Sequence, residues 1–218
     1  MTRKIKRTII ATVIIVIITV ICSFNSNVAN GSNTAEVPMR TLYSLDQREL
    51  TIPRSQVETY LNLGWFLEPV TKLYSPTGGF IVVAKTDIED YKQKGYKEPL
   101  PVNESDVVLL AKVIHAEATQ HSNFRVLDRQ YVGAVVLNRV KHPSFPNDLR
   151  SVIYAPSQYA CVGTYLFNQH PPQECLDIAR QLLEGETFGV PSNVVFQAQF
   201  TQGKGVWKRV GVHYYCYI

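Results

Sequence analysis

Two residues able to do chemistry, His115 and Glu117, lie two positions apart in the stretch "AKVIHAEATQ", residues 111–120. The pair could bind a metal, one of the two could act as an acid or base, or both could be structural. His-x-Glu is half of the zinc-deaminase signature, but the Pro-Cys-x-x-Cys half is absent from the chain, as is His-Glu-x-x-His. Residues two apart on a helix lie about 200° apart around its axis, so the two side chains cannot ligate one ion without local unwinding. No metal site is therefore expected.

Acid–base chemistry by Glu117 alone is the second interpretation. An enzyme that cleaves a glycosidic bond needs a carboxylic acid that protonates the leaving oxygen. On a helical wheel, Glu117 falls beside Leu110 at the border of the apolar stripe, where its carboxyl group is expected to be partly desolvated. The structural alternatives stay open: Glu117 as a solvated helix residue, His115 as a half-buried residue bonded to the backbone, and Asn138 as an amide that either orients Glu117 or ties helices together.

The elements that position these residues are predicted from periodicity and capping signals. Apolar residues with a period of 3.6 predict a helix from about residue 105 to 118, with Asn103 as its N-cap, and a second helix over about 128–141 that ends before Pro143. "NDLRSVIYA" predicts a short helix, and "QECLDIARQLLEG" predicts another that Gly185 ends. The tail, with "NVVFQAQF" and "GVHYYCY", predicts a β-hairpin joined through "TQGKGVWKRV". The predicted fold class is α+β, with a mainly helical domain followed by a small C-terminal β-hairpin.

Charge and apolar runs separate the N-terminal segment from the rest of the chain. Four of the 22 basic residues lie among the first seven positions and precede an uncharged run from Thr8 to Cys22, which is the layout of a signal peptide or membrane anchor over residues 1–29. The protein is therefore expected to be exported, and to stay in the membrane if this segment is not cleaved. The remaining 18 basic residues equal the 18 acidic ones in number, so the composition does not support a nucleic-acid partner. No cofactor is indicated.

Six blocks of the C-terminal part occur in the order and spacing of one known family. The blocks are "LLAKVIHAEA", "YVGAVVLNRVKHPSFPNDLRSVIY", "PSQYACV", "ECLDIARQLLEGE", "VVFQAQF" and "GVHYYCY". In them the chain resembles the SleB-type cell-wall hydrolases, which include spore-cortex-lytic enzymes, over about residues 105–218. The resemblance implies a fold similar to that of lysozyme-like lytic transglycosylases. It also implies that the catalytic residue is the glutamate of His-x-Glu-Ala, which is Glu117.

The resemblance implies peptidoglycan as the substrate, cut between N-acetylmuramic acid and N-acetylglucosamine. A lytic transglycosylase needs one carboxyl group, which protonates the leaving oxygen and then serves as the base while the muramic acid's own 6-hydroxyl attacks. Hydrolysis by water stays open because further carboxylates are available as a second group: Asp128, Asp148, Glu174 and Asp177. The alternative is an inactive wall-binding or assembly protein that retains the fold. A monomer is expected, either secreted to the wall or held at the outer face of the cytoplasmic membrane.

Polar and aromatic residues in the same blocks are candidates for lining a sugar cleft, each with packing as its alternative role. They are Asn138, Tyr154, Gln158, Gln197 and Tyr214. Three cysteines follow the N-terminal segment, Cys161, Cys175 and Cys216, and in an exported chain two of them can pair in three ways. The resemblance favours a disulfide between Cys161 and Cys216, because Cys175 lies in a more variable place and would be the free thiol.

A repeat precedes this domain, within residues 40–99. "LYSLDQRELTIPRSQVETYLNLGW" from Leu42 and "LYSPTGGFIVVAKTDIEDYKQKGY" from Leu73 align at an offset of 31, and each predicts two strands and a helix. The two copies resemble short repeats found in tandem in exported proteins of Gram-positive bacteria. They are interpreted as a spacer or, through the aromatic residues Trp65, Phe66 and Tyr96, as a wall-binding module.

Overall fold

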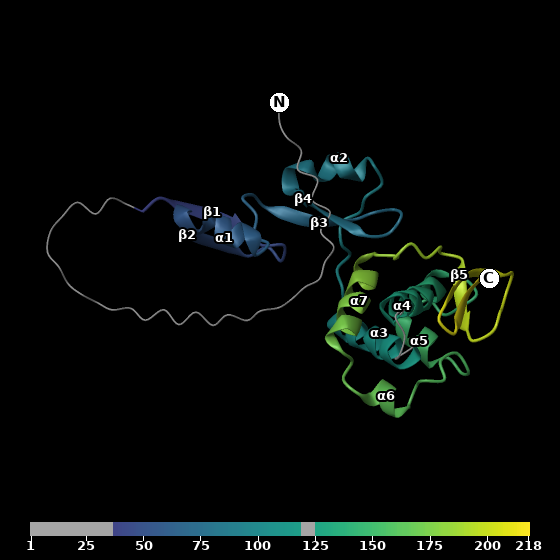
Figure 1. The fold of residues 1–218 in the computed structure, drawn as a ribbon. Coiled ribbons are helices and arrows are strands. Elements are labelled where there is room, and N and C mark those ends of the chain that lie inside the picture. Colours follow the sequence, from purple (N-terminus) through teal and green to yellow (C-terminus); the bar gives the residue numbers. More distant parts are fainter. Residues whose placement is uncertain (1–36, 119–124) are drawn as a thin grey trace, which may run out of the picture. The chain divides into compact units, whose positions relative to one another are not determined.

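The computed structural model describes residues 37–118 and 125–218. The predicted signal peptide or anchor, residues 1–29, lies outside these ranges. Within them, no helix is both long enough and apolar enough to cross a bilayer. The chain forms two compact units, and the division falls between Pro69 and Val70. The predicted α+β class is confirmed, since helices and small antiparallel sheets make up the described residues (Figure 1).

Each repeat copy folds as two antiparallel strands followed by a short helix (Figure 1). Copy 1 consists of β1 (Met39–Tyr43), β2 (Glu49–Pro53) and α1 (Val57–Asn62), and copy 2 of β3 (Val70–Tyr74), β4 (Phe80–Ala84) and α2 (Ile88–Lys92). A 3-10 turn precedes each helix, at Arg54–Gln56 and Lys85–Asp87. After the helix the chain returns to pair with the first strand, at Phe66 in copy 1 and Lys97 in copy 2. The two copies therefore share their elements at the offset of 31 seen in the sequence.

The helices of the C-terminal domain follow copy 2 in the same compact unit. They are α3 (Glu104–Glu117), α4 (Arg125–Lys141), α5 (Leu149–Tyr154), α6 (Tyr165–Asn168) and α7 (Gln173–Glu184). Four match predicted helices, and α6, a single turn, was not predicted. Gly185 ends α7 in the left-handed conformation, with φ 119°, as predicted.

The core of this domain lies where α3, α4 and α7 cross. The apolar stripe predicted for α3 is buried, with Leu110 and Ile114 fully inaccessible to solvent. Gly133 of α4 lies at the closest approach, because a Cβ there would be 2.5 Å from Leu182 Cδ1 and 2.8 Å from Ile114 Cδ1. A glycine at this position lets the three helices pack at close distance, and this packing fixes the C-terminal end of α3.

The C-terminal sheet has one strand more than the predicted hairpin. β5 (Val194–Ala198), β6 (Val206–Val210) and β7 (His213–Tyr217) form an antiparallel sheet in the order β5-β7-β6. β6 comes from the segment expected to be only a connection. The sheet is joined to α4 by Asp128, whose fully buried carboxylate contacts His213 Nδ1 at 3.0 Å and accepts a hydrogen bond from the Tyr215 hydroxyl at 2.7 Å. A buried carboxylate requires such partners, so this cluster fixes β7 on α4.

Candidate active site

Glu117 is the last residue of α3, and the local sequence explains its position. The helix begins at the predicted N-cap, Asn103, whose side chain accepts a hydrogen bond from the Ser105 N–H at 2.9 Å. It ends because Ala118 has an extended backbone, with φ −73° and ψ 149°. Glu117 is half-buried, one turn beyond the fully buried Val113. Its carboxyl group therefore lies beside the core but within reach of solvent, at the border position that the helical wheel predicts.

Cys161, in the segment that follows α5, holds the Glu117 carboxylate. The Cys161 backbone N–H donates to Glu117 Oε1 at 3.1 Å, and the Cys161 thiol also hydrogen-bonds the Glu117 side chain. Burial, and after it the contact with Glu117, raise the pKa of the Cys161 thiol well above its ordinary range. The thiol therefore stays a neutral donor. Two donors from one residue fix the direction of the carboxyl group.

A buried arginine, Arg139 of α4, fixes the segment that contains Cys161. Its guanidinium carbon lies 5.0 Å from the centroid of the Tyr159 ring. Its Nε donates to the Val195 carbonyl oxygen at 2.7 Å, and its Nη1 donates to Gln158 Oε1 at 3.3 Å. Arg139 thus joins α4, β5 and residues 158–161. Because Cys161 belongs to this segment, Arg139 indirectly fixes the partner of Glu117.

Tyr159 is influenced by the charges of both Arg139 and Glu117. It is buried, and burial raises the pKa of its hydroxyl to about 12, with a further increase from the charge of Glu117 and an opposing effect of Arg139. The phenol is therefore neutral at physiological pH. Arg139 and Glu117 both act electrostatically on this ring, which places the three side chains in one neighbourhood.

The carboxylates considered as a second catalytic group have structural partners. Asp128 belongs to the buried cluster with His213 and Tyr215. Asp148 accepts from the Ser151 N–H at 2.8 Å and caps α5. Glu174 pairs with Arg129, and Asp177 accepts from Gln173 Nε2 at 2.8 Å on the exposed side of α7. The acid that the structure associates with residues 158–161 is Glu117.

Two of the predicted sugar-binding residues are engaged in contacts within the protein. The Asn138 side chain donates to the carbonyl oxygens of Pro191 and Val194, at 2.9 Å each, so it ties α4 to the start of β5 instead of orienting Glu117. Gln158 is exposed and accepts from Arg139. Gln158 belongs to the same short segment as Cys161, which bonds Glu117, and it also bonds Arg139. Among the predicted sugar-binding residues, it is therefore the one most directly linked to Glu117.

The other predicted binders lie in separate contexts. Tyr154 is 44% exposed at the end of α5 and lines a shallow hollow of about 300 Å³ together with Lys112 of α3 and Arg150. Gln197, half-buried in β5, lies opposite Tyr215, and its Oε1 has no hydrogen-bond partner among the described residues. Tyr214 is half-buried in β7, with the Arg209 guanidinium carbon 5.0 Å from its ring centroid. The hollow at Tyr154 faces the outer side of α3, away from the border that carries Glu117.

The predicted Cys161 and Cys216 disulfide is wrong for this structure. Cys161, Cys175 and Cys216 are all buried and free. Cys161 directs its thiol at Glu117, whereas Cys216 lies in β7, paired with Phe196 and Val206 in neighbouring strands. Membership in conserved-looking blocks does not bring two Cβ atoms to the separation that a disulfide requires.

His115 lies at the other border of α3 and is half-buried. Burial, followed by the charge of the Arg129 guanidinium, lowers the pKa of His115 below its ordinary value. The imidazole is therefore neutral at physiological pH. Its position, two residues from Glu117, gives it a different set of neighbours from those of the carboxyl group.

The side chain in this arrangement that can transfer a proton is the Glu117 carboxyl group. A half-buried carboxyl group, held through Cys161 and backed by Tyr159 and Arg139, can donate a proton to a leaving oxygen and take one back. Sequence reasoning proposed Glu117 as the acid but did not point to Arg139, to Tyr159 or to the contact of Cys161 with Glu117. The sequence did contain a signal for Arg139, because it follows Asn138 on the inward face of a helix. A buried arginine must find polar partners inside the fold.

Comparison with known proteins relates part of the chain to a described family. Residues 126–216 match the family model described as Cell Wall Hydrolase, and Glu117 precedes the matched residues. A spore cortex-lytic enzyme of Halalkalibacterium halodurans is 24% identical over 135 residues, which cover 60% of this chain and 40% of that protein. A spore cortex-lytic enzyme of Bacillus cereus is 25% identical over 130 residues, which cover 57% of this chain and 49% of that protein.

Further similarities cover the same part of the chain. A spore cortex-lytic enzyme of Bacillus subtilis is 24% identical over 117 residues, which cover 51% of this chain and 37% of that protein. The chain thus spans less than half the length of these curated relatives. The crystal structure of the catalytic domain of the Bacillus cereus SleB protein is similar at 23% identity and a TM-score of 0.46, over 54% of this chain and 94% of that domain.

Proposed function

The C-terminal part of this chain belongs to the cell wall hydrolase family, and from this we propose that the protein cleaves the glycan strands of peptidoglycan. The bond is the one between N-acetylmuramic acid and N-acetylglucosamine, and Glu117 is the catalytic residue. The uncharged N-terminal run supports export, which places the enzyme on the outer side of the cytoplasmic membrane, where its substrate is.

The observation that carries the proposal is the setting of one carboxyl group. Glu117 is half-buried at the end of α3, with its direction fixed by Cys161, while Asp128, Asp148 and Glu174 are bound to structural partners. A single positioned acid favours the lytic transglycosylase reaction over the two-carboxylate mechanisms of most glycosidases.

The reaction balances with Glu117 alone. The protonated carboxyl group donates its proton to the bridging oxygen as the bond to the anomeric carbon of muramic acid breaks. The muramic acid's 6-hydroxyl oxygen then bonds to that carbon, and its proton passes to the Glu117 carboxylate. The products are a 1,6-anhydromuramic end and a free 4-hydroxyl group on N-acetylglucosamine, and the acid is regenerated. Water in place of the 6-hydroxyl would give a reducing end.

The test is the clearing of a peptidoglycan suspension by Glu117→Gln in the full chain. Loss of the proton donor is expected to lower the rate at least about 100-fold, within the range that general acid catalysis contributes. Asp177→Asn is the matched control, because Asp177 is exposed and was a candidate second carboxylate. It should clear at the parent rate, and both variants should melt at the parent temperature. A Glu117→Gln variant as fast as the parent contradicts the assignment of the acid.

Mass spectrometry of the released fragments separates the two reactions. Anhydromuramic ends are expected, and reducing muramic ends in their place would show hydrolysis. No release of fragments by the parent chain, together with binding to the wall, would show the inactive wall-binding protein.

A further inference from the structure

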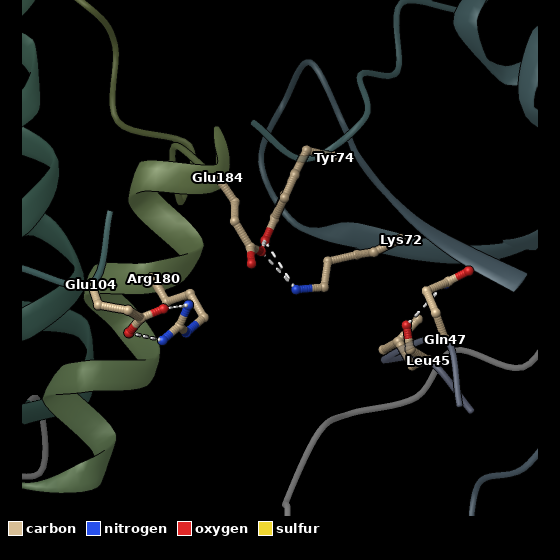
Figure 2. A network of polar contacts seen from close by, with 7 residues as sticks. All are labelled: Leu45, Gln47, Lys72, Tyr74, Glu104, Arg180 and Glu184. Atoms are coloured by element: carbon tan, nitrogen blue, oxygen red, sulfur yellow. Dashed lines mark hydrogen bonds and ion pairs between the residues drawn. The ribbon is translucent and has the colours of Figure 1, made fainter. Parts of the chain in front are cut away.

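Copy 2 contacts the helical domain at one face, which consists of Glu184 at the end of α7 and of Glu186 and Gly189 in the loop that follows. We call this set the docking face. Figure 2 shows Glu184 pointing from α7 toward Lys72 and Tyr74 of β3. Copy 2 and the helices also belong to one compact unit, Val70–Ile218.

Glu184 makes the charged part of the contact. Lys72 Nζ lies 2.8 Å from Glu184 Oε2, and the side chains of the pair are only 20% and 15% exposed. The hydroxyl of Tyr74 donates to the same carboxylate oxygen, and Tyr74 is 2% exposed. Burial and then Glu184 raise the pKa of Tyr74, so its hydroxyl stays a donor. Partial burial strengthens this ion pair relative to one on the surface, and makes its removal more damaging.

Glu186 makes the second part of the contact. It is 4% exposed, and its Oε1 accepts N–H bonds from Thr187 at 2.9 Å, from Phe188 at 2.7 Å and from Gly79 of copy 2 at 2.8 Å. A buried carboxylate needs its donors, so separating copy 2 would leave this one short of a partner. The same oxygen therefore shapes the loop after α7 and binds the turn between β3 and β4.

The backbone at Gly78 of copy 2 packs directly against the backbone at Gly189, so this contact has no room for a side chain at position 78. A Cβ at Gly78 would lie 2.5 Å from the Gly189 nitrogen, and Gly78 has φ +95°. Backbone atoms cannot move aside as a flexible side chain does. Glycine is thus required at this contact for both its conformation and its size.

Copy 1 lacks the residues that make the contact. At the offset of 31, Thr41 stands at the position of Lys72 and Gln47 at that of Gly78, although Tyr43 matches Tyr74. Thr41 has no cation for Glu184, and Gln47 brings a side chain where a Cβ is already too large. In copy 1, Gln47 instead donates to its own Leu45 carbonyl at 3.2 Å (Figure 2). The docking face therefore fits copy 2 and not copy 1.

The loop that copy 2 supports leads into the candidate active site. Pro191 and Val194, at its end, hold Asn138 through their carbonyl oxygens, and Val195 holds Arg139. Arg139 stacks on Tyr159, whose neighbour Cys161 bonds Glu117. Copy 2 is thus linked to the acid by side-chain contacts that are joined, between residues 186 and 195 and between residues 159 and 161, by short stretches of backbone.

We propose that copy 2 is a built-in part of the catalytic unit that positions Glu117 through residues 186–195, and is neither a spacer nor a separate wall-binding module. The part of this inference that concerns activity rests on the proposed function. Lys72, Gly78 and Glu186 act in it as positioning residues, since none of them reaches the acid.

The test uses the full chain and two pairs of variants. Gly78→Ala is compared with Gly64→Ala, because Gly64 of copy 1 has a similar φ of +89° but no atom within 4 Å of an added Cβ. Lys72→Met is compared with Lys92→Met, because Lys92 of α2 also forms ion pairs, with Glu89 and Glu98, but on the surface. Lys72→Met keeps the test usable if Gly78→Ala does not fold.

Two readouts decide the inference. Gly78→Ala and Lys72→Met should raise hydrogen exchange of the amides of residues 186–195 by about tenfold or more, whereas the control variants should match the parent. The same two variants should lower the turnover rate at saturating peptidoglycan with the KM unchanged, because the acid is misplaced while the cleft is intact. Exchange or turnover equal to that of the controls would overturn the inference. A parent chain without activity would instead count against the proposed function, and the exchange readout would still test the docking.

Discussion

Replacing Asn138 by Ala tests whether this residue supports the site or binds sugar. In the structure its Nδ2 makes two 2.9 Å bonds, to a buried carbonyl of Val194 and a partly buried one of Pro191. The variant removes both bonds, which costs about 1–3 kcal/mol at the buried Val194 carbonyl. The cost at the Pro191 carbonyl is smaller, because this oxygen keeps the Val194 N–H as a donor at 3.0 Å. The sum is about 2–4 kcal/mol of unfolding free energy. For a unit of this size that lowers the melting temperature by about 5–15 °C.

Thermal unfolding by circular dichroism measures this change. Asn168→Ala is the matched control, because its Nδ2 makes a single exposed bond to Gly163 at 3.2 Å, and its melting temperature should fall by less than about 3 °C. Isothermal titration with soluble glycan fragments, below the melting range, should show unchanged affinity for Asn138→Ala. A variant that melts with the parent but binds the fragments more weakly would refute our account, because its amide would then be a ligand of the sugar.

Two further predictions concern buried groups near Glu117. Burial and Glu117 raise the pKa of the Cys161 thiol, so iodoacetamide at pH 8 should leave Cys161 unlabelled in the native protein and label it after unfolding. The control is Tyr165→Cys, at a position 77% exposed, where the new thiol should be labelled at once. Rapid labelling of Cys161 in the native protein would show that it is not held against the acid. The pKa of Tyr159 is raised to about 12 in the folded state, so its contribution to stability is complete below pH 10 and is lost as the pH rises from about 10 to 12. The free energy of unfolding, measured in urea, should fall over this pH range by about 2–3 kcal/mol less in Tyr159→Phe than in the parent. An equal fall with pH in the two proteins would contradict the burial of this hydroxyl.

The helices of the C-terminal domain were predictable because their signals are local. The period of 3.6 in α3 reports which face is buried, and Asn103 and Gly185 mark helix ends by backbone chemistry that needs no distant partner. The resemblance to SleB-type hydrolases, carried by short blocks of sequence, is confirmed by the family match over residues 126–216. The position of Glu117 at the border of α3 followed from the same periodicity.

Features that depend on distant partners were not predictable. β6 is an edge strand, and its residues Val206, Lys208 and Arg209 are exposed. Its sequence therefore lacks the alternation of apolar and polar residues that would predict a strand. The pairing of Cys161 was misjudged because sequence blocks carry no information on the direction of a thiol. Arg139 became visible as part of the site only when α4, β5 and residues 158–161 came together.

The sequence by itself determined the helices and the two repeat copies, and it supplied the candidate acid, because periodicity, glycine positions and short motifs act over a few residues. It also contained the difference between the copies, a lysine and a glycine in copy 2 where copy 1 has Thr41 and Gln47. Only the tertiary structure decided what that difference does. The carboxylates that meet Lys72 and Gly79 lie over 100 residues further along the chain, and folding alone brings such partners within hydrogen-bonding distance.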